Sequence, residues 1–193
     1  MQPHKILITG TFDSGKTELI RMFSSDPNVA IVSEVARDVL AIDPSLQSKP
    51  GFQDILLREQ LRSEAIAEAT GKPIILCDRG SLDIIAFSLA LGIPIRNEWL
   101  ELTLGRYRSI MICDSRDIPP SIGEGEERLA SQSFRNIIDK RIRQVINDLA
   151  EIDPIKPSIH EVSGTLIERK SYLSQYIELT MSLREGNLLN RER

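Results

Sequence analysis

The residues whose types and spacing could do chemistry begin with an octapeptide near the N-terminus. Residues 10–17 read GTFDSGKT and fit the pattern G-x-x-x-x-G-K-T, between a short apolar run and a helical pattern. In such a loop several backbone N–H groups converge on one point, and the dipole of the following helix adds about half a positive charge there. The stretch therefore predicts a binding site for the phosphates of a nucleotide such as ATP.

Individual members of this loop have their own chemistry. Lys16 would place its ammonium between the β- and γ-phosphates, and the Thr17 hydroxyl suits Mg²⁺, a hard cation that prefers oxygen ligands. Asp13 departs from the usual pattern, because Gly often stands there and a carboxylate brings negative charge toward the phosphates. The residues expected to bind the nucleotide are Gly10, Thr11, Phe12, Asp13, Ser14, Gly15, Lys16 and Thr17.

A second pair with chemical potential is Glu34 and Arg37, in the sequence E-V-A-R directly after the apolar run 29–32. Residues three apart on the first turn of a helix share a face. Glu34 would take the proton from an attacking hydroxyl, and Arg37 would steer the acceptor or stabilise phosphoryl charge. The alternative is a capping carboxylate beside a surface arginine.

A third pair, Asp78 and Arg79, follows the apolar run 73–77. Asp78 ends a strand as a Walker-B carboxylate does and would hold Mg²⁺ through water beside Thr17; the alternative is a helix N-cap. Arg79 would reach a phosphate or the substrate. Its alternative is a structural ion pair with Glu34 or Asp114.

The least regular part of the chain, about residues 115–131, contains prolines, glycines and a run of glutamates. We expect this segment to be a lid that carries Arg128, with Arg135 one or two turns beyond. Arginines that close over the γ-phosphate would neutralise charge and exclude water. The alternative is that these are solvated surface arginines.

The elements that must position these residues alternate along the chain. Helical patterns occur at 16–23, 35–42, 52–69, 81–91, 98–107, 131–149 and 166–183, and strand patterns at 6–8, 29–32, 73–77, 109–113 and 159–162. The strand runs lack alternation of polar residues, which indicates strands covered on both faces. We therefore predict an α/β three-layer sandwich, with a five-stranded parallel sheet between helices and a lid, as one domain over residues 1–193.

Composition narrows the class of protein. The 193 residues carry a net charge of −4, which argues against nucleic-acid binding driven by overall charge. The two cysteines, Cys77 and Cys113, have no metal-ligand spacing and suggest buried thiols in a reducing compartment. No apolar stretch approaches the roughly 20 residues that span a bilayer. We expect a cytoplasmic protein with no membrane segment.

Taken together, these motifs resemble the P-loop kinase-like ATPase domain family that includes the nicotinamide riboside kinase domain and, more distantly, deoxynucleoside and polynucleotide kinases. The matching stretches are GTFDSGKT, EVAR, CDRGSLD at 77–83 and the predicted lid. The resemblance implies ATP and Mg²⁺ as cofactors, Glu34 as the acidic base, and Arg79 as the arginine of an acidic-Arg pair. Phe52-Gln53 resembles the Phe-Gln of deoxynucleoside kinases, in which Gln meets the base.

The sequence thus favours a kinase that moves the γ-phosphoryl group of Mg-ATP to a hydroxyl of a nucleoside or nucleoside-like small molecule. The residues expected to act in catalysis are Lys16, Glu34, Arg37, Asp78, Arg79 and Arg128, with Thr17 and Asp78 toward the metal. Two alternatives stay open: a nucleotide-dependent switch without an acceptor, and a polynucleotide 5′-kinase. A homodimer is compatible with the sequence.

Overall fold

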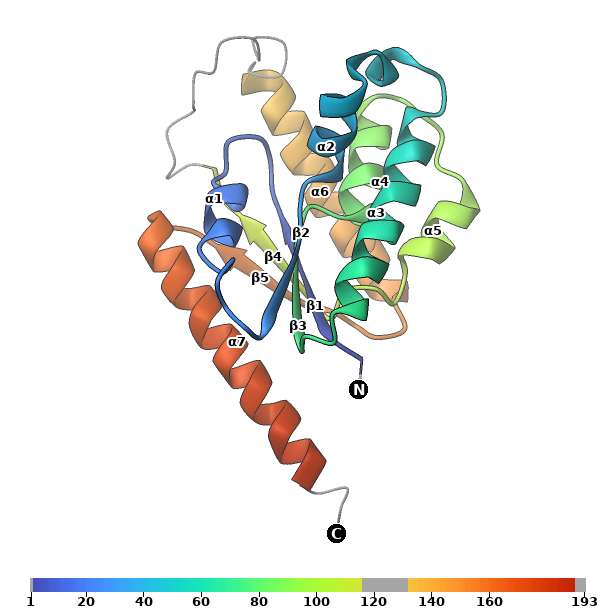
Figure 1. Ribbon diagram of the computed structural model, residues 1–193. Helices are drawn as coiled ribbons and strands as arrows, with labels where there is room; N and C mark the ends of the chain where they lie inside the picture. The colour runs from blue at the N-terminus through green and yellow to red at the C-terminus, as the bar shows by residue number, and fades with distance from the viewer. Residues whose placement is uncertain (1, 116–131, 190–193) are drawn as a thin grey trace.

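The computed structural model describes residues 2–115 and 132–189, and its centre is a five-stranded sheet in which every neighbouring pair is parallel (Figure 1). The strand order is β2-β3-β1-β4-β5. The strands are β1 (His4–Thr9), β2 (Val29–Val32), β3 (Ile74–Asp78), β4 (Ser109–Cys113) and β5 (Ser158–Val162). The predicted five-stranded parallel sheet with helices on both faces is confirmed.

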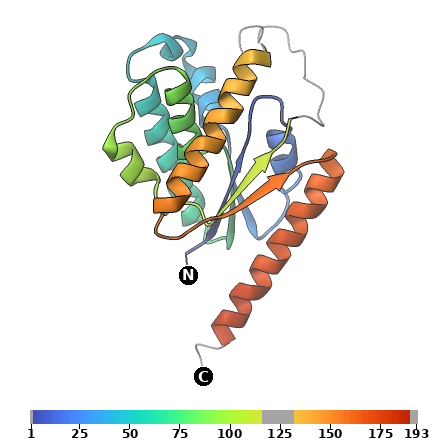
Figure 2. The same cartoon turned by 180° about the vertical axis from the view of Figure 1, so that it is seen from behind.

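Helices cover both faces of the sheet because successive residues of the central strands point to opposite sides. In β1, Leu7 packs into a core with residues of α4 and α6, whereas Ile6 and Ile8 pack into a core with α1 and α7. Figure 2 shows α6 and α7 on opposite faces of the sheet. The helices are α1 (Lys16–Arg21), α2 (Val35–Ile42), α3 (Phe52–Ala69), α4 (Ser81–Ala90), α5 (Asn97–Thr103), α6 (Gln132–Ile152) and α7 (Leu166–Leu189), with a 3₁₀ helix η1 (Pro44–Ser48).

The parallel arrangement brings the carboxyl ends of the strands to one edge of the sheet. β1 lies between β3 and β4, so the loop after β1 opens where the chain turns to opposite sides of the sheet. In open parallel sheets, ligands bind in the crevice at such a point. The segments that follow β1, β2 and β3 carry the three predicted motifs, and all three therefore reach the same edge.

Element boundaries differ from the sequence prediction mainly at helix ends. α5 ends at Thr103 because Gly105, with a φ of 75°, turns the chain toward β4. The last helix continues past residue 183 to Leu189. Most of the predicted lid, residues 116–131, lies outside the described residues. Within the described ranges, no helix combines the length and the apolar character that a membrane crossing requires.

Candidate active site

The loop between β1 and α1 has a backbone that few residue types can adopt. Gly10 has a φ of 138°, and a Cβ atom there would lie 2.5 Å from the carbonyl oxygen of Cys113. Gly15, the N-cap of α1, has a φ of 75°. Asp13 also has a positive φ, 51°, which Asp tolerates better than most residues. The unusual residue at position 13 therefore fits the loop geometry that the pattern requires.

Lys16 lies inside this loop with its side chain buried. Its ammonium donates to the carbonyl oxygen of Thr11 at 2.7 Å and to the hydroxyl of Ser14 at 3.0 Å, both neutral groups. Burial, helped by the nearby charge of Arg79, lowers the pKa of Lys16 to about 8. A buried cation bonded to neutral partners is a strong attractor for an anion such as a phosphate.

Thr17 and Asp78 meet as the sequence predicted for a metal site. The Thr17 hydroxyl donates to Asp78 Oδ2 at 2.6 Å, and Asp78 Oδ1 is buried without a hydrogen-bond partner. Burial raises the pKa of Asp78, which a bound cation would oppose. The N-cap alternative for Asp78 is wrong, since Gly80 caps α4. This oxygen donor set fits Mg²⁺.

No group of three acidic, histidine or cysteine side chains with metal-binding geometry occurs in the part of the chain that the structure describes. Mg²⁺ is commonly held by one or two protein oxygens together with phosphate oxygens and water. The two oxygens of Thr17 and Asp78 agree with that pattern. They would hold the cation only as part of a metal–nucleotide complex.

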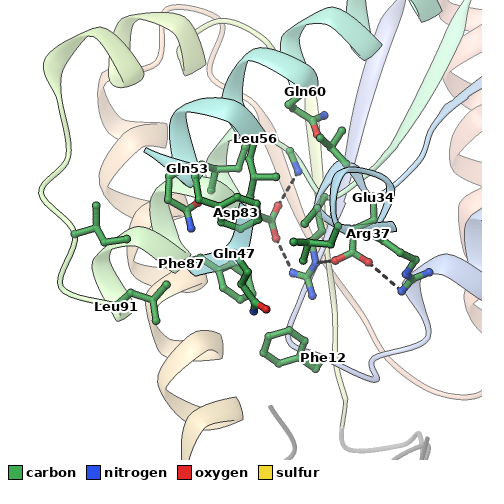
Figure 3. A pocket seen from close by; sticks show the side chains of 18 of the residues that line it. Phe12, Glu34, Arg37, Gln47, Gln53, Leu56, Gln60, Asp83, Phe87 and Leu91 are labelled. Carbon is green, nitrogen blue, oxygen red and sulfur yellow. Dashed lines mark hydrogen bonds and ion pairs between the residues drawn. The ribbon is translucent and has the colours of Figure 1, made fainter. Parts of the chain in front are cut away.

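Glu34, the N-cap residue of α2, pairs with two arginines (Figure 3). Its Oε1 lies 2.8 Å from Arg79 Nε, and its Oε2 lies 3.0 Å from Arg37 Nη2. Burial acts to raise the pKa of Glu34, but the charges of Arg79, Lys16 and Arg37 outweigh it and lower the pKa. Glu34 is therefore ionised at neutral pH and can accept a proton.

Arg79 is the central residue of this ion-pair cluster. It has a φ of 66°, and its guanidinium also donates to the carbonyl oxygen of Gly10 at 3.0 Å. The rings of Phe12 and Phe87 lie 5.5 and 5.1 Å from the guanidinium carbon. Of the two ion pairs considered for Arg79 from the sequence, the one with Glu34 is present.

Asp83 is a member of the cluster to which sequence reasoning assigned no role. Its carboxylate accepts hydrogen bonds from Arg79 at 3.1 Å and from the Thr9 hydroxyl at 2.7 Å. It also accepts from the backbone N–H of Gly80 at 3.0 Å. The signal in the sequence was its place in the first turn of the helix expected from residue 81, where a carboxylate can accept the backbone N–H of the N-cap residue.

A cleft of about 1560 Å³ joins the phosphate loop to the space between α2, α3 and α4. Its far wall is mostly apolar and aromatic, with Leu56, Phe87 and Trp99 among the lining residues. Gln53 lines the same wall, and its Oε1 is buried without a hydrogen-bond partner. Apolar walls with a few fixed polar groups are typical of small-molecule sites.

Of the two arginines expected at or just after the lid, Arg128 and Arg135, the structure describes only Arg135. Arg128 lies outside the described residues, so its position relative to the loop stays a prediction. Arg135, in the first turn of α6, lines the cleft and donates to the carbonyl oxygen of Phe12 at 3.0 Å. Its Nε is buried without a partner. Arg135 is thus a further cation beside the phosphate loop.

Arg169 of α7 was missed by sequence reasoning. Its fully buried guanidinium donates to three carbonyl oxygens, those of Ser14 at 2.8 Å, Gly164 at 2.8 Å and Asp114 at 2.6 Å. These bonds fasten the phosphate loop to the ends of β4 and β5. Nothing in the local sequence indicates this function, because the partners are backbone atoms of distant segments.

A protein-family model described as an AAA domain matches residues 5–169, a range that includes every predicted site residue. No curated protein matches the chain.

Several solved structures share the fold. They include a NadR protein in complex with NR (TM-score 0.62, 15% identity, covering 91% of this chain and 51% of that one). Deoxyadenosine kinase from M. mycoides, with the products dCMP and a flexible dCDP, has a TM-score of 0.64 at 13% identity and covers 90% and 98%. Thymidylate kinase from Ehrlichia chaffeensis has a TM-score of 0.57 at 15% identity and covers 92% and 100%. The chain spans about half the length of the NadR protein, and at these identities the likeness concerns the fold.

Proposed function

The chain belongs to the AAA domain family and has the fold of P-loop kinases, and from this premise we propose that it is an ATP-dependent phosphotransferase. The proposed reaction moves the γ-phosphoryl group of Mg-ATP to a hydroxyl of a nucleoside or nucleoside-like small molecule. The observation that carries this proposal is the position of Glu34. It is an ionised carboxylate that lines the same cleft as the phosphate loop and as an apolar wall suited to an acceptor.

Each residue of the site has a separate role in the proposed transfer. Glu34 accepts the proton of the acceptor hydroxyl, whose oxygen then bonds to the γ-phosphorus as the bond to the β-phosphate oxygen breaks and ADP leaves. Lys16 and Arg79 stabilise the charge on the phosphoryl oxygens, with Arg37 at the rim. Mg²⁺, when bound through Thr17 and Asp78, would neutralise phosphate charge. Arg128 of the predicted lid would add a further cation.

The acceptor side of the cleft favours a flat ring with a polar edge. Phe87 and Trp99 supply aromatic surface, and the free Gln53 Oε1 can accept one N–H hydrogen bond from a ring substituent. Structural neighbours include a deoxyadenosine kinase, a thymidylate kinase and a NadR protein crystallised with NR, which supports an acceptor of this general class. The two buried free cysteines agree with a reducing, cytoplasmic location.

A radiochemical screen tests the proposal. The protein is incubated with Mg²⁺, ATP labelled in its γ-phosphate, and a panel of nucleosides and nucleoside monophosphates. A labelled acceptor product is expected, and it should vanish in Lys16→Met, which removes the buried ammonium but keeps a side chain of similar length. Release of labelled phosphate at the same rate with and without every acceptor would instead favour the nucleotide-dependent switch.

A further inference from the structure

Next to the turn that carries Arg79 lies a second charged cluster, which the proposed reaction does not use. Its centre is Glu64 of α3, a fully buried carboxylate. Four donors reach this carboxylate, namely Lys5 Nζ at 3.0 Å, Arg106 Nε at 2.9 Å, Gln60 Nε2 at 3.0 Å and the Tyr107 hydroxyl at 2.7 Å. Burying a charge requires such a set of partners, so this cluster holds its members in fixed places.

The protonation states in this cluster follow from its charges. Burial acts to raise the pKa of Glu64, but Lys5, Arg106 and hydrogen bonds from Tyr107 and Gln60 outweigh it and lower the pKa. Burial raises the pKa of Tyr107 well above its ordinary value. Glu64 is therefore an anion and Tyr107 a neutral phenol, so the single phenolic proton points to the carboxylate.

Because the Tyr107 hydroxyl donates its proton to Glu64, its oxygen can only accept hydrogen bonds from other groups. It accepts the backbone N–H of Ser81 at 2.9 Å, and the Ser81 hydroxyl lies 3.2 Å away. Ser81 is the first residue of α4, where backbone N–H groups have no partner within the helix. Tyr107 thus fixes the start of α4, with the negative charge of Glu64 behind it.

Gly80 shows how tightly this turn is held. A Cβ atom at Gly80 would overlap the Tyr107 hydroxyl and come within 2.8 Å of Leu7 Cδ1. The preceding residue, Arg79, has the left-handed φ that aims its guanidinium at Glu34. The turn is therefore fixed by Tyr107 at Gly80 and Ser81 and by the ion pair at Arg79.

Gln60 connects the buried cluster to the cleft. It lines the cleft, and its Nε2 donates to the same Glu64 oxygen that accepts the Tyr107 proton. One continuous set of hydrogen bonds thus runs from the acceptor wall through Glu64 and Tyr107 to the turn that carries Arg79.

We propose that Tyr107, oriented by Glu64, is a positioning residue for Arg79: its hydroxyl sets the 79–81 turn so that the guanidinium stays on Glu34 beside the phosphate loop. This inference rests on the proposed function for its effect on turnover, but the geometry that it describes exists without an acceptor. Loss of the hydroxyl leaves the Ser81 N–H without its buried acceptor and frees the turn to shift.

The test compares Tyr107→Phe with Tyr176→Phe. Each variant loses one phenolic hydroxyl and keeps its ring, and Tyr176 bonds Ser109 and Ser158 away from the cleft. Circular dichroism first establishes that both are folded. In Tyr107→Phe, kcat is expected to fall about tenfold, as one lost buried hydrogen bond allows, with KM for ATP within about twofold of the wild type. In Tyr176→Phe, kcat is expected to stay at the wild-type value.

A double-mutant cycle with Arg79→Lys separates positioning from general loosening. If Tyr107 acts through Arg79, adding Tyr107→Phe to Arg79→Lys should lower kcat by less than about twofold, since the guanidinium that the turn positions is already gone. Equal tenfold losses in both backgrounds would overturn the proposal, as would equal kcat values for Tyr107→Phe and Tyr176→Phe.

A spectroscopic readout needs no acceptor. The Arg79 Nε–H, held on Glu34, should give a slowly exchanging side-chain resonance in NMR spectra of the isotope-labelled protein. This resonance should broaden or shift in Tyr107→Phe and stay in place in Tyr176→Phe. An unchanged resonance in Tyr107→Phe would overturn the proposal even if turnover fell. Should no acceptor be found, the proposed function would fail while this measurement still decided the role of Tyr107.

Discussion

Glu34 and Glu64 are both carboxylates bonded to arginine, yet the structure treats them differently. The Glu34 side chain is 17% exposed and lines the cleft, and its partner Arg37 is 60% exposed. The Glu64 side chain is 0% exposed and has donors on all sides within the core behind the cleft wall. Both have a lowered pKa, because in both cases arginine or lysine charges outweigh the effect of burial.

A shifted pKa therefore does not by itself mark a reacting group. Glu64 has used its hydrogen-bonding capacity on four protein donors, so it has little left for a ligand. Glu34 faces the cleft, and Arg37, one of its two arginine partners, is largely exposed to solvent. Glu34 can therefore exchange its bond to Arg37 for a bond to an acceptor hydroxyl. Substitutions at Glu64 should therefore mainly change stability, and substitutions at Glu34 should mainly change turnover.

The largest expected effect is on turnover at Glu34. Glu34→Gln keeps the shape but removes the base, and kcat is expected to fall about 10³-fold while ATP binding stays close to wild type. Glu59→Gln, which alters an exposed carboxylate on α3 paired with Arg62, serves as the control. A wild-type kcat in Glu34→Gln would show that Glu34 is not the base of the reaction.

The next effect is on stability at Glu64. Glu64→Gln removes the buried carboxylate that faces Lys5 and the partly buried Arg106, and the free energy of unfolding is expected to fall by about 3 kcal/mol. Equilibrium urea unfolding measures it. Glu68→Gln is the matched control, because Glu68 also pairs with Lys5 but is half-exposed. A change at Glu64 no larger than at Glu68 would mean that the buried cluster does not stabilise the fold.

A smaller effect is expected at Arg37, the exposed one of the two arginines that pair with Glu34. Arg37→Ala removes an exposed partner, so unfolding free energy should change by less than about 1 kcal/mol while kcat/KM for the acceptor falls several-fold. Arg62→Ala controls for the loss of a surface charge, because Arg62 is also exposed and also pairs with a glutamate three residues before it, Glu59. Equal kcat/KM values in the two variants would mean that Arg37 is only a surface arginine with no role toward the acceptor.

The smallest effect is a pH dependence that belongs to neither cluster. Burial, with the charges of Arg108 and Arg184, lowers the pKa of His4 from 6.5 to about 4. The unfolded chain therefore binds more protons than the folded one between these values, so stability falls as pH drops from 6.5 to 4. His4→Gln should flatten the unfolding free energy over that interval. The pKa values of Glu34 and Glu64 are lowered from 4.5, so the stability that these two carboxylates contribute is lost only as the pH falls through about 4.5 and below.

Much of the fold followed from local patterns. Val29–Val32 and Ser109–Cys113 were predicted to the residue, because an uninterrupted apolar run between turn residues has few other uses in a chain of this class. The extent of α7 was underestimated, since the polar residues after 183 gave no periodic signal. The phosphate loop was readable because it is contiguous and its chemistry lies in the backbone.

The rest of the candidate site was only partly predictable. Glu34, Asp78 and Arg79 were found because parallel strands bring their ends to one edge, so position after a strand is itself a signal. Asp83 could have been found from its place in the first turn of α4, where a carboxylate reaches back to the backbone N–H of the N-cap residue. Tyr107 and Arg169 could not, since their partners are a backbone N–H and backbone carbonyls in segments far along the chain.

The sequence alone determined the sheet and the phosphate loop, because apolar periodicity and the Gly-Lys-Thr spacing act over neighbouring residues. Only the tertiary structure decided which charges face the cleft and which are enclosed in the core. Glu34 is the N-cap of α2 and Glu64 lies within α3, and the decisive difference between them is the set of side chains that packing brings around each. That set depends on contacts among α2, α3, α4 and the loop before β4, which no local pattern encodes.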